Sequence, residues 1–176
     1  MNVISGKYKR KKLLGFNLKE TRPTMDRVKE SMFAMIQNHI DDSVCLDLFA
    51  GSGALGIEAL SMGAKKCYFV DNNNDAIKVI NKNLVGVEEE KIIIRKDYQE
   101  ALKLFEKNKI IFDIIFLDPP YKKYDIEHII ENIIKKKIIK KNGLIIVETN
   151  ESININLNLY KSRKISDKQI LIYKVL

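Results

Sequence analysis

Short apolar runs alternate with longer segments of mixed polarity from residue 44 onward. The apolar runs have the length and composition of buried strands, and the mixed segments repeat their apolar residues at helical spacing. The expected strands are Val44–Phe49, Lys66–Val70, Lys91–Ile94, Ile114–Leu117 and Gly143–Glu148. The expected helices are Ala54–Met62, Asn74–Leu84, Tyr98–Phe105 and Ile126–Ile134. Strands that alternate with helices predict a parallel α/β sheet with helices on both faces.

The last part of the chain departs from this alternation. Two strand-like runs, Leu157–Ile165 and Gln169–Val175, are joined only by Ser166-Asp167-Lys168. Three residues leave no room for a crossover helix, so the two runs predict an antiparallel hairpin at the end of the sheet. The chain has 176 residues and neither a linker nor a repeat. We therefore expect a single domain, with residues 21–176 as its core and residues 1–20 as an extension.

The extension and the first helix follow from the pattern before residue 44. Val3–Ser5 and Lys12–Phe16 flank a run of basic residues, which predicts a small basic hairpin. Apolar residues then recur at helical spacing as far as Ile40. A helix is therefore expected to open at Pro23-Thr24, with Thr24 as its N-cap.

The net charge of +8 is concentrated at the N-terminus, where the first thirty residues hold nine basic and three acidic side chains. A general bias toward lysine would be spread evenly, whereas a local cluster that includes Tyr8 is typical of a phosphate-binding surface. The alternative is a solubilising arm or, for Arg27 and Lys29, a solvated helix face. A second basic run at residues 135–141 is interpreted as a solvated helix end. The candidate nucleic-acid contacts are Lys7, Tyr8, Lys9, Arg10, Lys11, Lys12, Arg27 and Lys29.

Bulk composition argues against several other classes of protein. Hydrophobic residues make up 45% of the chain and charged residues 31%, which is ordinary for a globular domain. No run of about 18 uncharged apolar residues occurs, so no membrane span is expected, and the polar, basic N-terminus does not suggest secretion. Cys45 and Cys67 lie in apolar runs without histidines or further cysteines nearby. We therefore expect free thiols in a reducing cytoplasm and no metal site.

A glycine-rich turn, Gly51-Ser52-Gly53-Ala54-Leu55-Gly56, follows the first predicted strand. Glycines let the main chain pass close beneath a ligand and face it with a helix N-terminus. Asp71 comes 20 residues after Gly51, at the end of the second strand. A carboxylate in that position can accept from both hydroxyls of a ribose. The pattern therefore predicts a cofactor that contains adenosine, and the alternative is a packing turn.

Asp47 and Asp118 favour S-adenosylmethionine over a nicotinamide dinucleotide. Asp47 lies inside the end of the first strand, where it can face the positive amino and sulfonium groups but would repel a pyrophosphate. Asp118 ends the fourth strand, where a transferred methyl group would meet its acceptor. Asp97 is a candidate acceptor for the adenine amino group and Tyr98 a stacking partner for the adenine ring, unless both are solvated turn residues. The candidate cofactor contacts are Asp47, Phe49, Ala50, Gly51, Ser52, Gly53, Asp71, Asn72, Asp97 and Tyr98.

The motif Asp118-Pro119-Pro120-Tyr121 directly follows the apolar run Ile114–Leu117. Each proline fixes its own φ angle and lacks an N–H, so we expect the carbonyls of Asp118 and Pro119 to accept hydrogen bonds from a ligand. Tyr121 adds a flat ring. A carboxylate, main-chain carbonyls and an aromatic face suit a nucleobase with an exocyclic amino group. The alternative is a simple turn at the strand end.

These motifs together resemble the RsmD family, the 16S rRNA (guanine(966)-N(2))-methyltransferases. The resemblance lies in the segments 3–8, 22–30, 47–60 and 118–121, and the most specific of them is the block Arg22-Pro23-Thr24-x-Asp26-Arg27-Val28. It implies a Rossmann-like class I methyltransferase fold with seven strands, of which the last hairpin is antiparallel. It also implies S-adenosylmethionine as methyl donor and a guanine of small-subunit ribosomal RNA as acceptor, and it adds Arg22 and Thr24 to the cofactor contacts.

The catalytic residues expected on this basis are Asp118, Pro119, Pro120 and Tyr121. Asp118 and the Pro119 carbonyl would hold the guanine amino group for in-line attack on the methyl carbon, and Tyr121 would stack on the unstacked base. We expect a cytoplasmic monomer that acts on an assembling 30S particle. Three alternatives remain at this level: an adenine-N6 DNA methyltransferase, a non-catalytic RNA-binding assembly factor and an NAD oxidoreductase.

Overall fold

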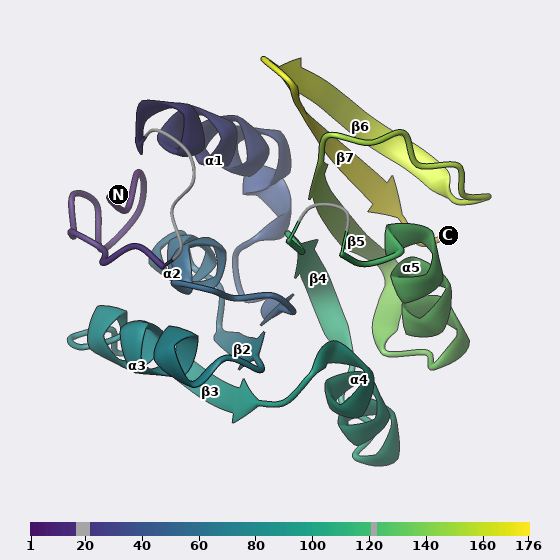
Figure 1. Cartoon of the computed structure of the whole chain (residues 1–176), viewed down its shortest axis with the longest axis horizontal. Helices are drawn as coiled ribbons and strands as arrows, with labels where there is room; N and C mark the ends of the chain where they lie inside the picture. The colour runs from purple at the N-terminus through teal and green to yellow at the C-terminus, as the bar shows by residue number, and fades with distance from the viewer. Residues whose placement is uncertain (17–21, 121–122) are drawn as a thin grey trace.

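The computed structural model describes residues 1–16, 22–120 and 123–176, and it contains a seven-stranded sheet with the order β3-β2-β1-β4-β5-β7-β6 (Figure 1). The strands are β1 Val44–Asp47, β2 Lys66–Asp71, β3 Glu90–Arg95, β4 Phe112–Leu117, β5 Ile139–Thr149, β6 Asn158–Ile165 and β7 Lys168–Lys174. The helices are α1 Arg22–Ile36, the short 3₁₀ helix η1 Gln37–His39, α2 Ala54–Ser61, α3 Asn74–Asn83, α4 Tyr98–Lys107 and α5 Ile126–Lys135. The predicted α/β class and the antiparallel C-terminal hairpin are confirmed.

Strand direction brings several loops to one edge of the sheet. Strands β1 to β5 are parallel, so their carboxyl ends all lie at that edge. Strand β7 pairs antiparallel with β5, and Gln169 at the start of β7 lies opposite Thr149 at the end of β5. The turn between β6 and β7 therefore lies at the same edge. In parallel α/β sheets this edge is where ligands bind.

Both faces of the sheet are covered, which explains the nearly continuous apolar runs of its strands. Helices α1, α2 and α3 pack on one face, where their buried residues join Cys45, Phe69 and Phe116 in one core cluster. Helices α4 and α5 cover the other face, where Leu46 and Ile115 belong to a second cluster. Successive strand residues thus alternate between two separate cores.

The beginning of the chain differs from the prediction in two respects. The N-terminal hairpin is shorter than expected: an antiparallel bridge joins Asn2 and Lys12, the Val3 N–H donates to the Lys11 carbonyl and the Leu13 N–H to the Met1 carbonyl, both at 2.9 Å, and turns connect the two sides. Arg10 has a φ of 73°, a left-handed conformation that interrupts an extended strand. Helix α1 already begins at Arg22, so Thr24 lies inside its first turn and is not its N-cap. Pro23 does not delay the helix, because the first turn needs no N–H from it.

Within the described ranges, none of the helices is both long enough and apolar enough to cross a membrane. The same ranges contain no cluster of three or more His, Cys, Asp or Glu side chains suited to a metal ion.

Candidate active site

The glycine-rich turn lies between β1 and α2 and depends on its glycines for two different reasons. Gly51 and Gly53 have φ angles of 53° and 79°, which side-chain-bearing residues rarely adopt. At Gly56 the restriction is steric, because a Cβ atom would lie 2.3 Å from Phe69 Cε1 and 2.7 Å from Cys67 Sγ. Gly56 therefore lets α2 pack directly on β2. The turn and the helix N-terminus together leave main chain facing the carboxyl edge of the sheet.

Asp71, at the end of β2, ties this turn to the neighbouring loop. Its Oδ2 accepts a hydrogen bond from the Gly51 N–H at 2.9 Å, and its Oδ1 accepts from the Asn73 N–H at 2.8 Å. Each carboxylate oxygen has a further acceptor site, so these bonds orient Asp71 without exhausting it. Asn72 beside it is exposed. The predicted ribose contact by Asp71 and the predicted cofactor contact by Asn72 stay predictions, and the geometry of Asp71 is compatible with the first of them.

The buried Asp47 carboxylate binds the main chain of the first turn of α2. It is buried, with 1% of its surface exposed, and accepts from the Gly56 N–H at 3.1 Å. Burial raises the pKa of Asp47 to about 7, the Gly56 hydrogen bond opposes this rise, and the nearby Asp71 adds to it. Ala50 is also buried, whereas Phe49 and Ser52 are partly exposed. The structure thus assigns Asp47 a part in shaping the turn, and its predicted contact with a cofactor remains untested.

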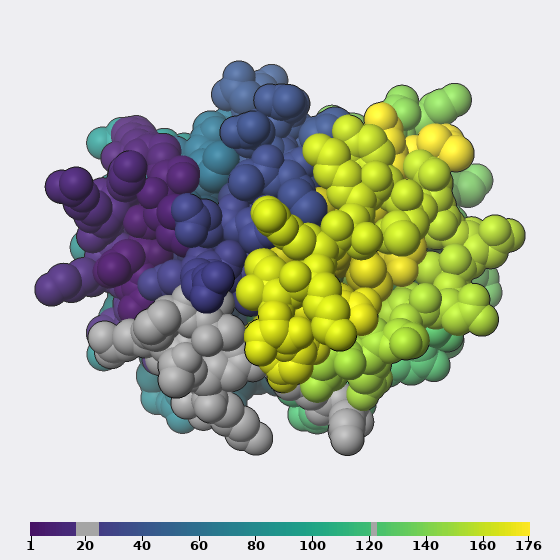
Figure 2. Space-filling model, turned by 90° about the horizontal axis from the view of Figure 1, so that it is seen from above, coloured from purple at the N-terminus to yellow at the C-terminus, as the bar shows by residue number. Residues whose placement is uncertain are grey.

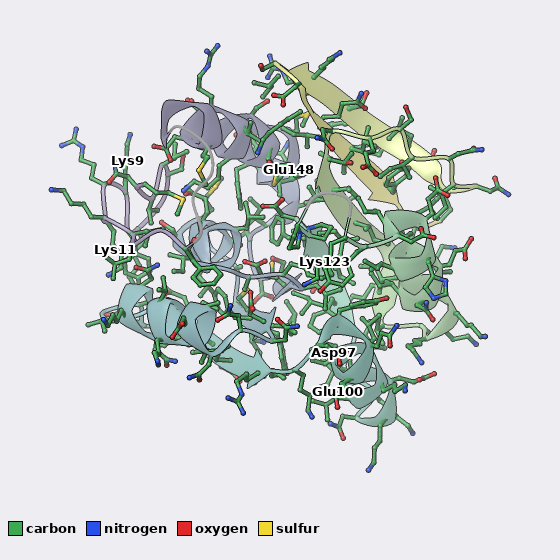
Figure 3. The ribbon with its side chains drawn as sticks, in the orientation of Figure 1. Lys9, Lys11, Asp97, Glu100, Lys123 and Glu148 are labelled. Atoms are coloured by element: carbon green, nitrogen blue, oxygen red, sulfur yellow. The ribbon has the colours of Figure 1, made fainter. Side chains whose placement is uncertain are left out.

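Three aromatic rings meet where the loops after β1, β3 and β4 come together. The centroid of Phe49 lies 5.8 Å from that of Tyr98 and 5.1 Å from that of Tyr124, and Tyr98 and Tyr124 are 5.5 Å apart. Sequence reasoning identified Phe49 and Tyr98 but missed Tyr124. That residue follows the proline motif, outside any run of apolar residues with helix or strand spacing. Asp97 caps α4 by accepting from the Glu100 N–H at 2.9 Å, and Figure 3 shows both side chains at the start of that helix.

The proline motif leaves β4 beside this aromatic cluster. Asp118 is partly exposed, Pro119 is buried and Pro120 is exposed. Tyr121, the predicted stacking residue, lies outside the described residues. Pro119 and Pro120 line a small cavity at the carboxyl ends of β4 and β5; its other lining residues are Tyr124, Ile126, Glu148, Thr149, Asn150 and Glu151.

The two motifs are neighbours because β1 and β4 are neighbours. Asp47 pairs with Phe116, and the Leu48 N–H donates to the Phe116 carbonyl at 3.2 Å, one residue beyond the end of β1. The glycine turn and Asp118 therefore leave adjacent strands at the same edge of the sheet. A ligand in the turn and a second ligand at Asp118 would lie side by side, which is the arrangement that a transfer reaction requires.

Comparison with known proteins identifies the family of the chain. The family model described as "Conserved hypothetical protein 95" matches residues 1–174. Ribosomal RNA small subunit methyltransferase D of Haemophilus influenzae is 38% identical over 152 residues, which is 85% of this chain and 78% of that protein. The chain belongs to the RsmD family. Another relative of the RsmD-like chain, the Bacillus subtilis protein named "Putative rRNA methyltransferase YlbH", is 41% identical over 157 residues, or 88% and 85% of the two chains.

The fold of this RsmD-family chain also matches solved structures along its whole length. The Escherichia coli structure described as "Putative methyltransferase yhhF" has a TM-score of 0.86 at 26% identity, and the match covers 99% of this chain and 97% of that one. The expected Rossmann-like methyltransferase fold is therefore confirmed.

The N-terminal turn of this RsmD-family chain uses part of its basic residues to attach itself to the core. Lys7 Nζ lies 2.6 Å from Glu88 Oε2 and 3.1 Å from Glu89 Oε1, and the Tyr8 hydroxyl donates to Glu89 Oε2 at 2.7 Å. Lys11 Nζ donates to the Val85 carbonyl at 2.6 Å. Figure 3 labels Lys9 and Lys11 in this turn, and Lys9, Arg10 and Lys12 are its exposed candidates for phosphate.

The prediction that Lys29 contacts nucleic acid is wrong. Its side chain is buried, lies 2.9 Å from Glu58 Oε2 and donates to the Asn2 carbonyl at 2.6 Å. Arg27, two residues earlier on α1, is exposed as predicted. Arg22 and Thr24 begin the same helix, but their side chains lie outside the described part of the chain, so their cofactor contacts stay predictions.

The burial of Asp47 predicts a pH-dependent stability. Its pKa rises from 3.8 to about 7 on folding, so between these values the folded state keeps a proton that the unfolded state has released. Stability should therefore fall as pH rises from about 4 to about 7. Asp47→Asn should flatten this part of the curve of Tm against pH, measured by circular dichroism, whereas the exposed Asp97→Asn should not. Parallel curves for wild type and Asp47→Asn would contradict the prediction.

Proposed function

We propose that this chain transfers a methyl group from S-adenosylmethionine to the exocyclic N2 of a guanine in small-subunit ribosomal RNA. The observation that carries the proposal is the exit of the glycine turn and of Asp118-Pro119 from adjacent parallel strands at one edge. The names of the relatives support the class of reaction and the type of substrate. The base and the atom that receive the methyl group are our inference from the chemistry of Asp118.

The residues of the glycine turn fit the cofactor. Gly51 and Gly53 have positive φ angles and, being glycines, carry no side chain where a ligand would approach. The N-terminus of α2 faces the same space. Asp71 would accept from the ribose hydroxyls, and Tyr98 with Phe49 would pack against the adenine ring. S-adenosylmethionine supplies an electrophilic methyl group on its sulfonium. The remaining work falls to this chain, which must place and orient the nucleophile.

Asp118 and Pro119 would perform that work on the guanine. The amino nitrogen is a weak nucleophile because its lone pair is delocalised into the ring. The Asp118 carboxylate and the Pro119 carbonyl would accept its two N–H bonds, hold the nitrogen in line and stabilise the positive charge that develops on it. The nitrogen becomes acidic once it carries the methyl group, and its proton then passes to Asp118 or to water. Tyr121 would stack on the base after it has left its neighbours in the RNA.

The decisive test supplies purified protein with S-adenosylmethionine labelled in the methyl group and with 30S particles, free 16S RNA or duplex DNA. We expect label in RNA and, after digestion, N2-methylguanosine as the labelled nucleoside in mass spectrometry. Label in DNA as N6-methyladenine would support the DNA methyltransferase instead. Binding of RNA without binding of S-adenosylmethionine in calorimetry would support an assembly factor. Comparison of 30S particles with free RNA also tests the proposal that the protein acts on an assembling particle.

The exposed cations of the N-terminal turn should contribute to RNA affinity by binding phosphates. Replacement of Lys9, Arg10 and Lys12 by glutamine should weaken RNA binding at about 0.15 M salt by several-fold. The slope of log K against log salt should also become smaller, by roughly 0.7–0.9 for each phosphate that the variant no longer neutralises. Fluorescence anisotropy over a salt series measures both quantities. An unchanged slope would show that this turn is a solubilising arm.

A further inference from the structure

A second basic surface, which the sequence did not reveal, lies on β6 at the edge of the sheet. Residues 158–174 contain five basic side chains and one acidic one. Lys168, one of the five, is buried in an ion pair with Glu148. Lys161, Arg163 and Lys164 are exposed on β6. Lys161 and Arg163 pair with Ile172 and Ile170 and project on the α1 side of the sheet, whereas Lys164 alternates to the other side of this edge strand. The outer strand of the sheet therefore presents cations along its edge.

Two of these cations are held against α1. Lys161 Nζ donates to the Met35 carbonyl at 2.7 Å, and Arg163 Nη1 donates to Ser31 Oγ at 3.1 Å. The later residue of β6 contacts the earlier residue of α1, so the two elements run antiparallel. Arg27 is exposed and lies one helical turn before Ser31, so it continues the row toward the β6–β7 turn. Figure 2 shows the yellow side chains of the C-terminal hairpin beside the blue ones of α1 on one face.

An exposed aromatic ring lies within this row. Tyr160 is 39% exposed, and the Nζ atoms of Lys161 and Lys174 lie 5.1 Å and 5.3 Å from its ring centroid. The ring of His39 meets it edge-on at 5.9 Å. Burial lowers the pKa of His39, and the nearby charges of Lys174 and Lys161 lower it further. Exposed aromatic rings beside cations are a common means of binding single-stranded nucleic acid.

The row leads to the candidate active site. Ile165 at the end of β6 pairs with Lys168, and Gln169 pairs with Thr149 at the carboxyl end of β5. Thr149 lines the cavity beside Pro119 and Pro120. A chain of nucleotides along β6 would therefore arrive at the edge of the sheet where Asp118 lies. Among the described residues, the exposed acidic side chains near this path are Glu30 on α1, Asp167 in the turn and Glu151 at the cavity, fewer than the four cations Arg27, Lys161, Arg163 and Lys164.

We propose that β6 and the adjoining face of α1 bind the sugar–phosphate backbone of the substrate RNA next to the nucleotide held at Asp118. Lys161, Arg163, Lys164 and Arg27 contact phosphates, and Tyr160 offers a stacking face. This inference rests on the proposed function, since it deepens the choice of RNA as substrate. Lysines on an edge strand also discourage strand pairing between molecules. That role alone requires neither the hydrogen bonds to α1 nor an exposed tyrosine between two lysines.

The test compares two triple variants in which lysine or arginine is replaced by glutamine. The first changes Lys161, Arg163 and Lys164 on β6. The matched control changes Lys135, Lys137 and Lys141, which are exposed near the junction of α5 and β5, at the opposite, amino-terminal edge of the sheet. The probe is a fluorescent fragment of 16S RNA, and binding is measured by anisotropy from low to physiological salt. Because the β6 variant also gives up its hydrogen bonds to α1, Lys164→Glu serves as a second variant; among the described residues, Lys164 makes no hydrogen bond to that helix.

We expect the β6 variant to bind the RNA about tenfold more weakly at about 0.15 M salt, with a salt slope smaller by roughly 2. Its affinity for S-adenosylmethionine and its turnover at saturating RNA should equal those of wild type, so the loss would appear in KM. Lys164→Glu should show a weaker change in the same direction, and the control should bind as wild type does. Equal binding by the β6 variant and the control would overturn the inference. The binding measurement does not depend on methylation. Failure of this inference is therefore distinguishable from failure of the proposed function, in which the wild-type protein would bind RNA without methylating it.

Discussion

Asp118→Asn should lower the rate of methyl transfer by about 10²–10³-fold, the usual cost of removing one electrostatic group from a preorganised site. Asparagine keeps the size of the side chain but removes the negative charge that would stabilise the positive charge developing on the reacting nitrogen. Its amide nitrogen is also a donor, and it would face the N–H bonds of the guanine if the amide turned that way. The loss should appear in kcat, because the glycine turn that we propose as the cofactor site is unchanged.

Single-turnover methylation of small-subunit RNA measures this rate, and calorimetry with S-adenosylmethionine checks that the cofactor still binds. Asp113→Asn is the matched control, since Asp113 lies at the opposite end of the same strand, accepts from the Val44 N–H at 2.9 Å and pairs with Lys140. Near wild-type turnover by Asp118→Asn would refute the proposed role of this carboxylate. Loss of cofactor binding in that variant would instead assign Asp118 to the cofactor site.

Lys29→Met should destabilise the folded protein by about 3–5 kcal/mol, because it leaves a buried carboxylate without its cation. Glu58 is completely buried on α2, and its oxygens accept from the Ile4 and Ser5 N–H groups at 2.7–3.0 Å as well as from Lys29. One carboxylate thus joins α2, α1 and the N-terminal segment. When the ammonium group of Lys29 is removed, the buried negative charge of Glu58 destabilises the folded state.

Urea unfolding followed by circular dichroism measures this change in the free energy of unfolding. Lys78→Met is the control, because the ion pair of Lys78 with Asp75 is exposed and should contribute less than about 1 kcal/mol. The double variant Lys29→Met/Glu58→Gln should recover part of the lost stability, since no buried charge then remains. A loss in Lys29→Met no larger than that in Lys78→Met would show that Glu58 is stabilised by the two main-chain N–H groups alone.

The sheet and its order of strands and helices could be predicted from the chain because both faces of the sheet are buried. Each strand except the exposed edge strand β6 then contains a short apolar run. The strand ends moved by only a few residues in the structure; β5 moved most, beginning at Ile139 rather than Gly143. The candidate site followed from the same logic, since loops after parallel strands meet at one edge. Asp47, Asp71, Asp97 and Asp118 are all found there or directly beneath it.

The tertiary structure decided what depends on pairs of residues far apart in the chain. Lys29 has the same local pattern as an exposed helix residue, and only the approach of Glu58 explains why it is buried. Tyr124 joins Phe49 and Tyr98 because three loops converge. Arg163 belongs to a continuous cationic surface only because β6 folds back beside α1, which lies more than a hundred residues earlier. The local spacing of apolar residues determines which face of each helix or strand is buried. Which other element packs against that face is decided only when the whole chain folds.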